Sequence, residues 1–241
     1  MKKLLTIAFA ASAIAAAADS TVAGNEVGIL KVTSSLENTV VAVPFTELGG
    51  GNVCVSNIVK TANLKAGDEL YVYSGGAYKA WVLTTGADSA LYWKAVGNAT
   101  IGADGTISHS DGAAADSTTL AAGSAVWLAR KGSGHGTLSS EPFYVYGGTP
   151  GSISQSVTAG TKSAPVWNLV ANPTGAAATP SIASPAKLDE IRIPNGTTSP
   201  TRCIYNGSVW QRQGATGLPS IPVGQGFWYI SKGGSGAVSW N

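Results

Sequence analysis

The fold is constrained most by a succession of short extended segments that turn residues divide. Runs rich in Val, Ile, Tyr and Trp alternate with clusters of Gly, Ser, Asn and Pro, and no apolar stripe with helical spacing follows the first 18 residues. Such side chains suit a half-buried pleated surface, and many short strands joined by turns are typical of an all-β sandwich or barrel. The expected strands cover residues 27–32, 39–45, 69–73, 78–83, 125–129, 143–146, 166–171, 190–193, 203–205, 226–230 and 237–240.

The composition excludes a disordered chain and a charged coiled coil. Hydrophobic residues make up 44% of the 241 residues, which is a normal supply for a packed core. Charged residues make up 12%, against about 25% in an average protein. A disordered chain would need low hydrophobicity and high charge.

The first 18 residues have the features of an export signal. Lys2 and Lys3 precede a short apolar run, and the alanines at 16–18 offer the small-residue pattern that signal peptidase requires. We therefore expect residues 1–18 to be removed and the protein to be extracellular, on the cell surface or in the periplasm. Spanning a membrane takes about 20 apolar residues, so this run is too short, and no later segment is continuously apolar enough.

The mature chain is expected to have no net formal charge. The full chain has 15 basic and 13 acidic residues, and removal of Lys2 and Lys3 leaves 13 of each. Apart from the Arg130-Lys131 pair, the basic residues are scattered singly, whereas binding to nucleic acid needs clustered Lys and Arg. The sequence therefore predicts no nucleic-acid partner, and a net charge near zero favours self-association.

Four features occur twice in the same order, which predicts an internal duplication. They are an extended run with a proline, an Asp before an alternating strand, a Trp after a turn, and a glycine turn before a Trp-containing strand. The predicted equivalences are Pro44 with Pro173, Asp68 with Asp189, Trp81 with Trp210, and Trp127 with Trp228.

The duplication predicts two related β-sandwich or barrel-like modules packed together. The first module is expected at residues 19–147 and the second at residues 148–241. The spacing between equivalent features differs from one pair to the next, so the copies must differ by insertions. The largest insertion is expected near residues 92–119 of the first module, as a long loop or a short extra hairpin.

The second copy resembles a known kind of module. It has the sequence WNLVANP at 167–173 and IPVGQGFWYI at 221–230. These motifs resemble duplicated β-modules of secreted and surface-attached bacterial proteins, which pair a W-N-L-x-x-N-P strand with a later P-x-G-x-G-F strand. The resemblance covers mainly residues 167–240. It implies extracellular β-structure in an adhesive, scaffold or accessory role, and it brings no catalytic residues.

Two cysteines, Cys54 and Cys203, leave two alternatives open. An even count in an exported chain suggests a disulfide, which would tie the two modules together. Two unpaired buried thiols would instead behave as small hydrophobic side chains.

The sequence predicts no catalytic, cofactor or metal site. His109 and His135 lie in Gly- and Ser-rich stretches, where we expect them to be exposed and inert, and no G-x-S-x-G motif is present. The pairs Asp68-Glu69 and Asp189-Glu190 recur at equivalent places, which a repeated structural role explains better than one shared glycosidase site.

The aromatic residues are the remaining candidates for binding. Trp127 and Trp228 lie in apolar strands, where we expect both to be largely buried in the core. Exposed aromatic rings can stack on sugars, and the candidates for such stacking are Trp81, Trp93, Trp210 and Tyr78.

The sequence therefore predicts a secreted or cell-surface structural or interaction protein without catalytic activity. Its expected partners are a second copy of itself or an extracellular polysaccharide. The second hypothesis is a carbohydrate-binding module. The third is an outer-membrane β-barrel, which needs strands of about ten residues, whereas the expected strands are shorter.

Overall fold

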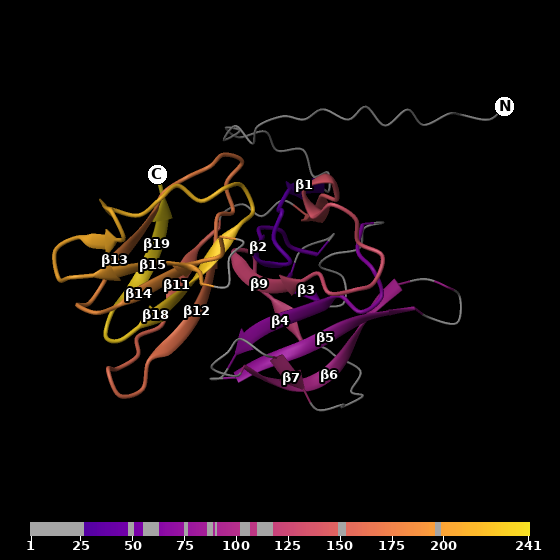
Figure 1. The fold of residues 1–241 in the computed structure, drawn as a ribbon, viewed down its shortest axis with the longest axis horizontal. Helices are drawn as coiled ribbons and strands as arrows, with labels where there is room; N and C mark the ends of the chain where they lie inside the picture. Colours follow the sequence, from indigo (N-terminus) through magenta and orange to yellow (C-terminus); the bar gives the residue numbers. More distant parts are fainter. Residues whose placement is uncertain are drawn as a thin grey trace.

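The structure is a computed structural model of an all-β protein, in which several antiparallel sheets pack together (Figure 1). It describes residues 27–47, 51–54, 63–74, 77–85, 89, 91–101, 107–109, 118–148, 153–195 and 199–241. The predicted all-β class is confirmed. The expected export signal at residues 1–18 lies outside the described residues. Within the described part of the chain, no helix has the length and apolar character to cross a membrane.

The strands fall into two groups along the chain. The first group consists of β1 (Val27–Val32), β2 (Asn38–Val43), β3 (Val53–Cys54), β4 (Glu69–Ser74), β5 (Ala77–Thr85), β6 (Leu91–Ile101), β7 (Ile107–His109), β8 (Thr119–Leu120), β9 (Ser124–Ala129) and β10 (Phe143–Gly148), with a 3-10 turn η2 at Leu138–Ser140. The second group consists of β11 (Gln155–Val157), β12 (Val166–Ala171), β13 (Pro180–Ser184), β14 (Glu190–Ile193), β15 (Thr201–Tyr205), β16 (Trp210–Arg212), β17 (Ala215–Thr216), β18 (Gly226–Ser231) and β19 (Ser235–Trp240).

The two groups have the same sheet topology. Six strands of the first group pair in the order β2-β9-β4-β5-β6-β7, and six of the second pair in the order β12-β18-β14-β15-β16-β17. Each sheet is accompanied by a smaller one, β1-β10 in the first group and β11-β19-β13 in the second. The pairing of β3 with β8 has its counterpart in an isolated bridge between Ala178 and Ile221. We refer to the two groups as the first and second modules.

Strand registers equate individual residues of the two modules. Trp127 on β9 pairs with Tyr71 on β4, and Trp228 on β18 pairs with Arg192 on β14. Because β4 and β14 each begin one residue after an Asp, these registers equate Trp127 with Trp228 and Asp68 with Asp189, as the sequence order predicted.

The predicted equivalence of Trp81 with Trp210 is wrong. Trp81 pairs with Leu70 across β4 and β5, at the place that Cys203 occupies opposite Ile191 in the second module. The counterpart of Trp210 is instead Trp93, since Leu83 pairs with Trp93 and Tyr205 pairs with Trp210.

The same registers place the expected insertion near residues 92–119 within the sheet. This segment contains β6 and β7, which occupy the positions of β16 and β17 in the second sheet. It is therefore a longer version of a shared hairpin. Residues 102–106 and 110–117 of the segment lie outside the described residues.

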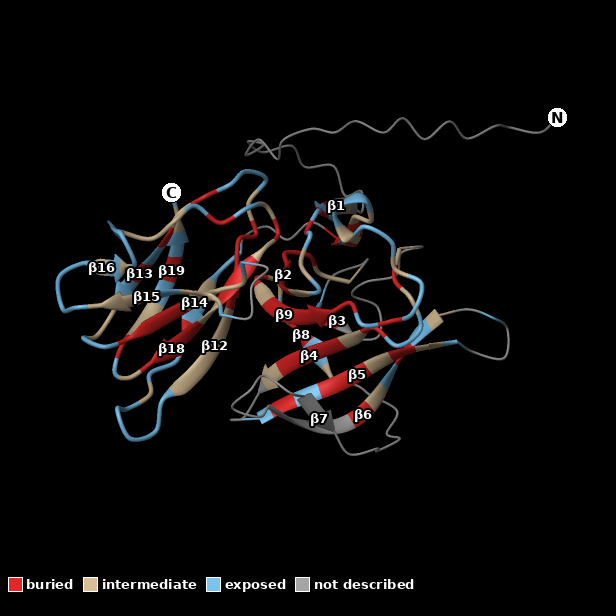
Figure 2. Ribbon diagram, viewed as in Figure 1, coloured by how far each residue is buried: buried red, intermediate tan, exposed pale blue. Residues whose placement is uncertain are grey.

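Each module has a core of its own, and a third cluster joins them. Figure 2 shows buried residues concentrated on β2, β9, β4 and β5 in the first module and on β14 and β18 in the second. The third cluster is aromatic and contains Tyr71, Tyr78 and Trp127, with Leu169 and Trp228 of the second module packed against it.

Equivalent parts of the two modules meet at their junction. The equivalent residues Trp127 and Trp228 meet edge to face, with ring centroids 5.3 Å apart. Ala42 N donates to Gly224 O at 3.0 Å. The counterparts of Ala42 and Gly224 are Ala171 and Gly123. Gln155 Nε2 connects these two residues, since it donates to Ala171 O at 2.8 Å and to Gly123 O at 2.7 Å. A meeting of equivalent residues in this way is what an approximate twofold relation between the modules predicts.

Candidate functional site

Asp189 stands at the start of β14 and is fully buried. Its carboxylate accepts hydrogen bonds from Ala186 N at 2.7 Å, from Lys232 N at 2.6 Å and from the hydroxyl of Tyr229. Backbone N–H groups are strong donors that a buried carboxylate needs, because an unsatisfied buried charge is costly. Asp189 therefore fixes the turn before β14 to the end of β18.

Asp68 makes the same arrangement in the first module. It is also fully buried, and it accepts hydrogen bonds from Lys65 N at 2.9 Å and Gly132 N at 2.8 Å. Its third donor differs, because Leu128 occupies the register position of Tyr229 and has no hydroxyl. Instead the Nε2 atom of His135 lies 2.9 Å from Asp68 Oδ1.

His135 is thus held in the fold, and its expected exposed position is wrong. Its side chain is only 8% exposed, and its second nitrogen, Nδ1, lies 2.7 Å from Glu141 Oε2. Burial alone would lower the pKa of His135, but the hydrogen bonds with Glu141 and Asp68 raise it above the usual value. Both ring nitrogens thus lie within hydrogen-bond distance of a carboxylate, Nδ1 of Glu141 and Nε2 of Asp68. The His109 side chain is not among those described.

A second charged cluster lies on the outer face of the second module. Glu190, the first residue of β14, is 2% exposed although it is ionisable. Its carboxylate contacts Arg192 Nε at 2.5 Å, Arg202 Nε at 2.8 Å and Lys232 Nζ at 3.8 Å. Burial alone would raise the pKa of Glu190, but the hydrogen bonds from Arg202 and Arg192 lower it overall.

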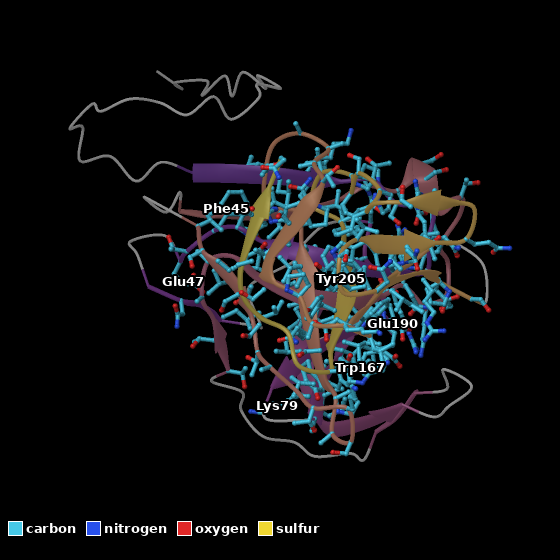
Figure 3. The ribbon with its side chains drawn as sticks, turned by 90° about the vertical axis from the view of Figure 1, so that its left-hand side faces the viewer. Phe45, Glu47, Lys79, Trp167, Glu190 and Tyr205 are labelled. Atoms are coloured by element: carbon cyan, nitrogen blue, oxygen red, sulfur yellow. The ribbon has the colours of Figure 1, made fainter. Side chains whose placement is uncertain are left out.

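The arginines of this cluster are partly open to solvent, and an aromatic ring supports one of them. The side chains of Arg192 and Arg202 are 39% and 55% exposed. The guanidinium carbon of Arg192 lies 5.1 Å from the ring centroid of Trp167, which is half-buried on β12. Figure 3 shows Trp167 and Glu190 close together on the module that faces the viewer. We refer to Trp167, Glu190, Arg192, Arg202 and Lys232 as the Glu190 face.

Three of the four residues predicted to stack on sugars are buried. Trp81, Trp93 and Tyr78 are 1%, 5% and 8% exposed, so they belong to the core and cannot offer a ring face to a ligand. Trp210 is half-buried and packs against Tyr205. The sequence reasoning missed Trp167 and Arg192, which the β14-β18-β12 pairing brings together.

Of the tryptophans predicted to lie in the core, Trp127 is 7% exposed, and its burial is confirmed. Trp228 is only half-buried, because it lies at the junction of the modules instead of inside one core.

The disulfide between Cys54 and Cys203 is not present. Cys203 is a free thiol, fully buried in the core of the second module, and burial raises its pKa. This is the alternative of a small buried hydrophobic side chain. The Cys54 side chain lies outside those described.

A small cavity lies between the modules, with a volume of about 100 Å³. It is lined by Thr39 and Val40 of the first module and by Ile193, Ile221 and Gln225 of the second, among others. Sites for drug-sized ligands have about 300–1,000 Å³, so this cavity does not hold one. Within the described part of the chain, no three His, Cys, Asp or Glu side chains are grouped so that they could hold a metal ion.

Comparison with known proteins finds no protein family, no curated protein and no solved structure that matches this chain.

Proposed function

We propose that this chain is an exported, non-enzymatic structural or interaction protein of a bacterial surface or secreted matrix. The observation that carries the proposal is that the buried titratable groups Asp68, Asp189 and His135 bind other parts of the fold. Asp68 and Asp189 bind backbone N–H groups at equivalent turns, and both nitrogens of His135 are occupied by carboxylates. These three buried groups, Asp68, Asp189 and His135, thus serve the fold.

Two further features support an interaction role. Ile29 and Tyr146 pair directly across β1 and β10, and they are 59% and 37% exposed. A polar-aromatic surface, the Glu190 face, lies on the other module. The basic start of the chain and the resemblance of 167–240 to modules of surface-attached proteins support export.

The proposal is tested with the full gene and with the mature chain. Expression in a bacterial host with an intact export pathway is expected to yield secreted or envelope-bound protein that begins at Asp19. The purified mature chain is expected to bind isolated cell envelopes without turnover of ester, peptide or glycoside substrates. Retention of Met1 in exported material, or turnover abolished by His135→Ala, would overturn the proposal.

The alternative function is a carbohydrate-binding module, and the stacking of Arg192 on the half-buried Trp167 favours it. A glycan array separates the two functions. Retention of one class of glycan, lost in Trp167→Ala, would favour the module, whereas envelope binding without any glycan signal would favour a protein partner or self-association.

A further inference from the structure

The Glu190 face carries more positive charge than its buried carboxylate needs. Three cations, Arg192, Arg202 and Lys232, surround the one carboxylate of Glu190. Within this cluster of described residues the three positive charges exceed the one negative charge by two, in a mature chain whose expected net charge is zero. Isolated surface cations are ordinary, but a group held at fixed positions by a buried partner is preorganised for an anion.

The first module shows what the fold alone requires at this place. Glu69 is the register equivalent of Glu190, and Lys131, its cation, is the equivalent of Lys232. The position of Arg192 is occupied there by Tyr71, whose hydroxyl donates to Glu69, and the position of Arg202 is occupied by Ala80. Lys131 and the Tyr71 hydroxyl are among the contacts of Glu69, and no arginine stands at either equivalent position of the first module, so the shared fold does not require the two arginines.

The donors of the two arginines are only partly used. Arg192 gives Nε to Glu190, and Arg202 gives Nε and Nη2. Within the described residues, the Nη atoms of Arg192 and the Nη1 atom of Arg202 have no hydrogen-bond partner. Guanidinium groups with free N–H donors in a fixed plane match carboxylate and sulfate groups by paired hydrogen bonds.

An aromatic surface adjoins these donors. Trp167 on β12 and Glu190 on β14 lie on either side of Ile230 of β18, and the Trp167 ring packs against the Arg192 guanidinium. Anionic groups attached to apolar ring faces, as in a chain of uronic acids or sulfated sugars, present both chemistries at once. We propose that the Glu190 face binds an acidic polysaccharide, with Arg192 and Arg202 holding its anionic groups and Trp167 packing against a sugar ring. This inference rests on the proposed function and names the partner class.

The binding test uses the mature chain, residues 19–241, and polymers of defined charge. Polygalacturonate provides carboxylates and heparin provides sulfates, while dextran is the neutral polysaccharide and polyglutamate the acidic polymer without sugar rings. We expect isothermal titration to give binding to at least one acidic polysaccharide that weakens as salt is raised, with none to dextran and less to polyglutamate. Equal binding to polyglutamate, or no acidic polysaccharide bound, would overturn the proposal.

A matched pair of double variants locates the site. Arg192→Gln with Arg202→Gln removes two charges from the Glu190 face, and Lys31→Gln with Lys79→Gln removes two charges from exposed positions of the first module. The arginine variant is expected to bind about tenfold more weakly, and the lysine variant to change by less than about twofold. Equal losses in both would mean unspecific attraction and would overturn the site.

Two further variants test the site even if the arginine-to-glutamine variant folds poorly. Arg192→Lys with Arg202→Lys retains the charge but lacks the paired donors, so its binding should weaken severalfold. Glu190→Gln removes the internal competitor for the arginines, so acidic polysaccharide should bind more tightly although the melting temperature falls. A purely structural cluster would lower the melting temperature of Glu190→Gln without any gain in binding.

Binding of envelopes or neutral glycans alone would overturn this inference and leave the proposed function standing, whereas turnover of the polymer would overturn the proposed function.

Discussion

At the scale of single residues, the two modules satisfy the same buried carboxylate with different donors. Asp189 receives a hydroxyl from Tyr229, and Asp68 receives a ring nitrogen from His135, which arrives from a loop after β9. The replacement is needed because Leu128 lies where Tyr229 would be. A buried acceptor that loses its donor costs about 1–3 kcal/mol, so each module must supply a third donor by some route.

The hydroxyl of Tyr229 can be removed almost without a change in volume. Tyr229→Phe is expected to lower the free energy of unfolding by about 1–3 kcal/mol, because the buried Asp189 carboxylate loses one of its donors. Urea denaturation of the mature chain measures the change. Tyr146→Phe is the control, since Tyr146 is exposed and should change stability by less than about 0.5 kcal/mol. Equal effects of the two substitutions would contradict this account of Asp189.

His135 should make the stability of the protein depend on pH. Its pKa is raised in the folded state, so its contribution is fully present below the unfolded pKa of about 6.5 and is lost as the pH rises through the folded value. The groups that face the ring are Asp68 and Glu141, and Lys65 and Arg130 lie near these carboxylates. We expect the melting temperature of wild type to exceed that of His135→Gln clearly at pH 6 and by less at pH 9.

Glu141 provides the control for this pH dependence. Its pKa is lowered by hydrogen bonds from Gly136 N and His135, so its contribution is present above pH 4.5 and is lost only as the pH falls. Glu141→Gln should therefore remove part of the difference between pH 6 and pH 9. A constant difference between wild type and His135→Gln across this range would show that the charge of the ring contributes nothing.

The role of His135 could not be predicted from its own surroundings in the sequence. A His between glycines is usually exposed, and the local pattern holds no sign of Asp68, which lies 67 positions away. The signal lies in the comparison of the two copies, because Tyr229 aligns with Leu128 once the glycine turns before Trp127 and Trp228 are superposed. A missing hydroxyl beside a buried Asp predicts a substitute donor, though not its position.

At the scale of elements, alternation and turn residues predicted most strands within one or two residues. The segments 27–32, 166–171 and 190–193 agree with β1, β12 and β14. The prediction failed for the hairpins, because the turns before β5 and before β16 are both followed by a Trp. These are Trp81 within β5 and Trp210 at the start of β16. Sequence alone does not say which hairpin is which, and only the strand pairing equates Trp93 with Trp210. The Glu190 face was missed for a similar reason, since its residues come from β12, β14 and β15 and from the segment directly after β18.

The glycine turns before β9 and β18 each pack against the other module. Gly224 has φ of +68°, and a Cβ there would lie 2.7 Å from Val32 Cγ2 of the first module. Gly214 has φ of +74°, but a Cβ there would meet nothing within 4 Å. Gly214→Ala should cost about 1–2 kcal/mol for the left-handed backbone. Gly224→Ala should cost about 1–3 kcal/mol more, because the methyl group overpacks the junction.

Urea denaturation of these two alanine variants gives the comparison. The matched φ values cancel the backbone contribution, so the difference reports the packing of Gly224 against the first module. Equal losses of stability in Gly224→Ala and Gly214→Ala would mean that the turn before β18 does not contact the first module in solution.

At the scale of the whole molecule, the junction brings residues of both modules into shared buried clusters. Ala171 of the second module belongs to the same buried cluster as the β2 and β9 residues, and Leu169 and Trp228 pack against it. The sequence predicted two related modules but could not predict their relative placement. Each module has its own periodicity, and residues that face a partner module have the same apolar pattern as residues that face a core.

Trp228 should therefore determine cooperativity more than the stability of its own module. We expect calorimetry of wild type to give a single transition whose calorimetric and van't Hoff enthalpies agree. Trp228→Ala removes the contact with Trp127 across the junction, so the transition should broaden or split into two. Trp210→Ala is the control, because among the described aromatic residues Trp210 contacts Tyr205 and Tyr229, both in the second module. We expect Trp210→Ala to have a lower melting temperature than wild type but still a single transition, because it leaves the contact between Trp127 and Trp228 in place. Two transitions in wild type, or one sharp and unshifted transition in Trp228→Ala, would mean that the modules unfold independently of the contact between their equivalent tryptophans.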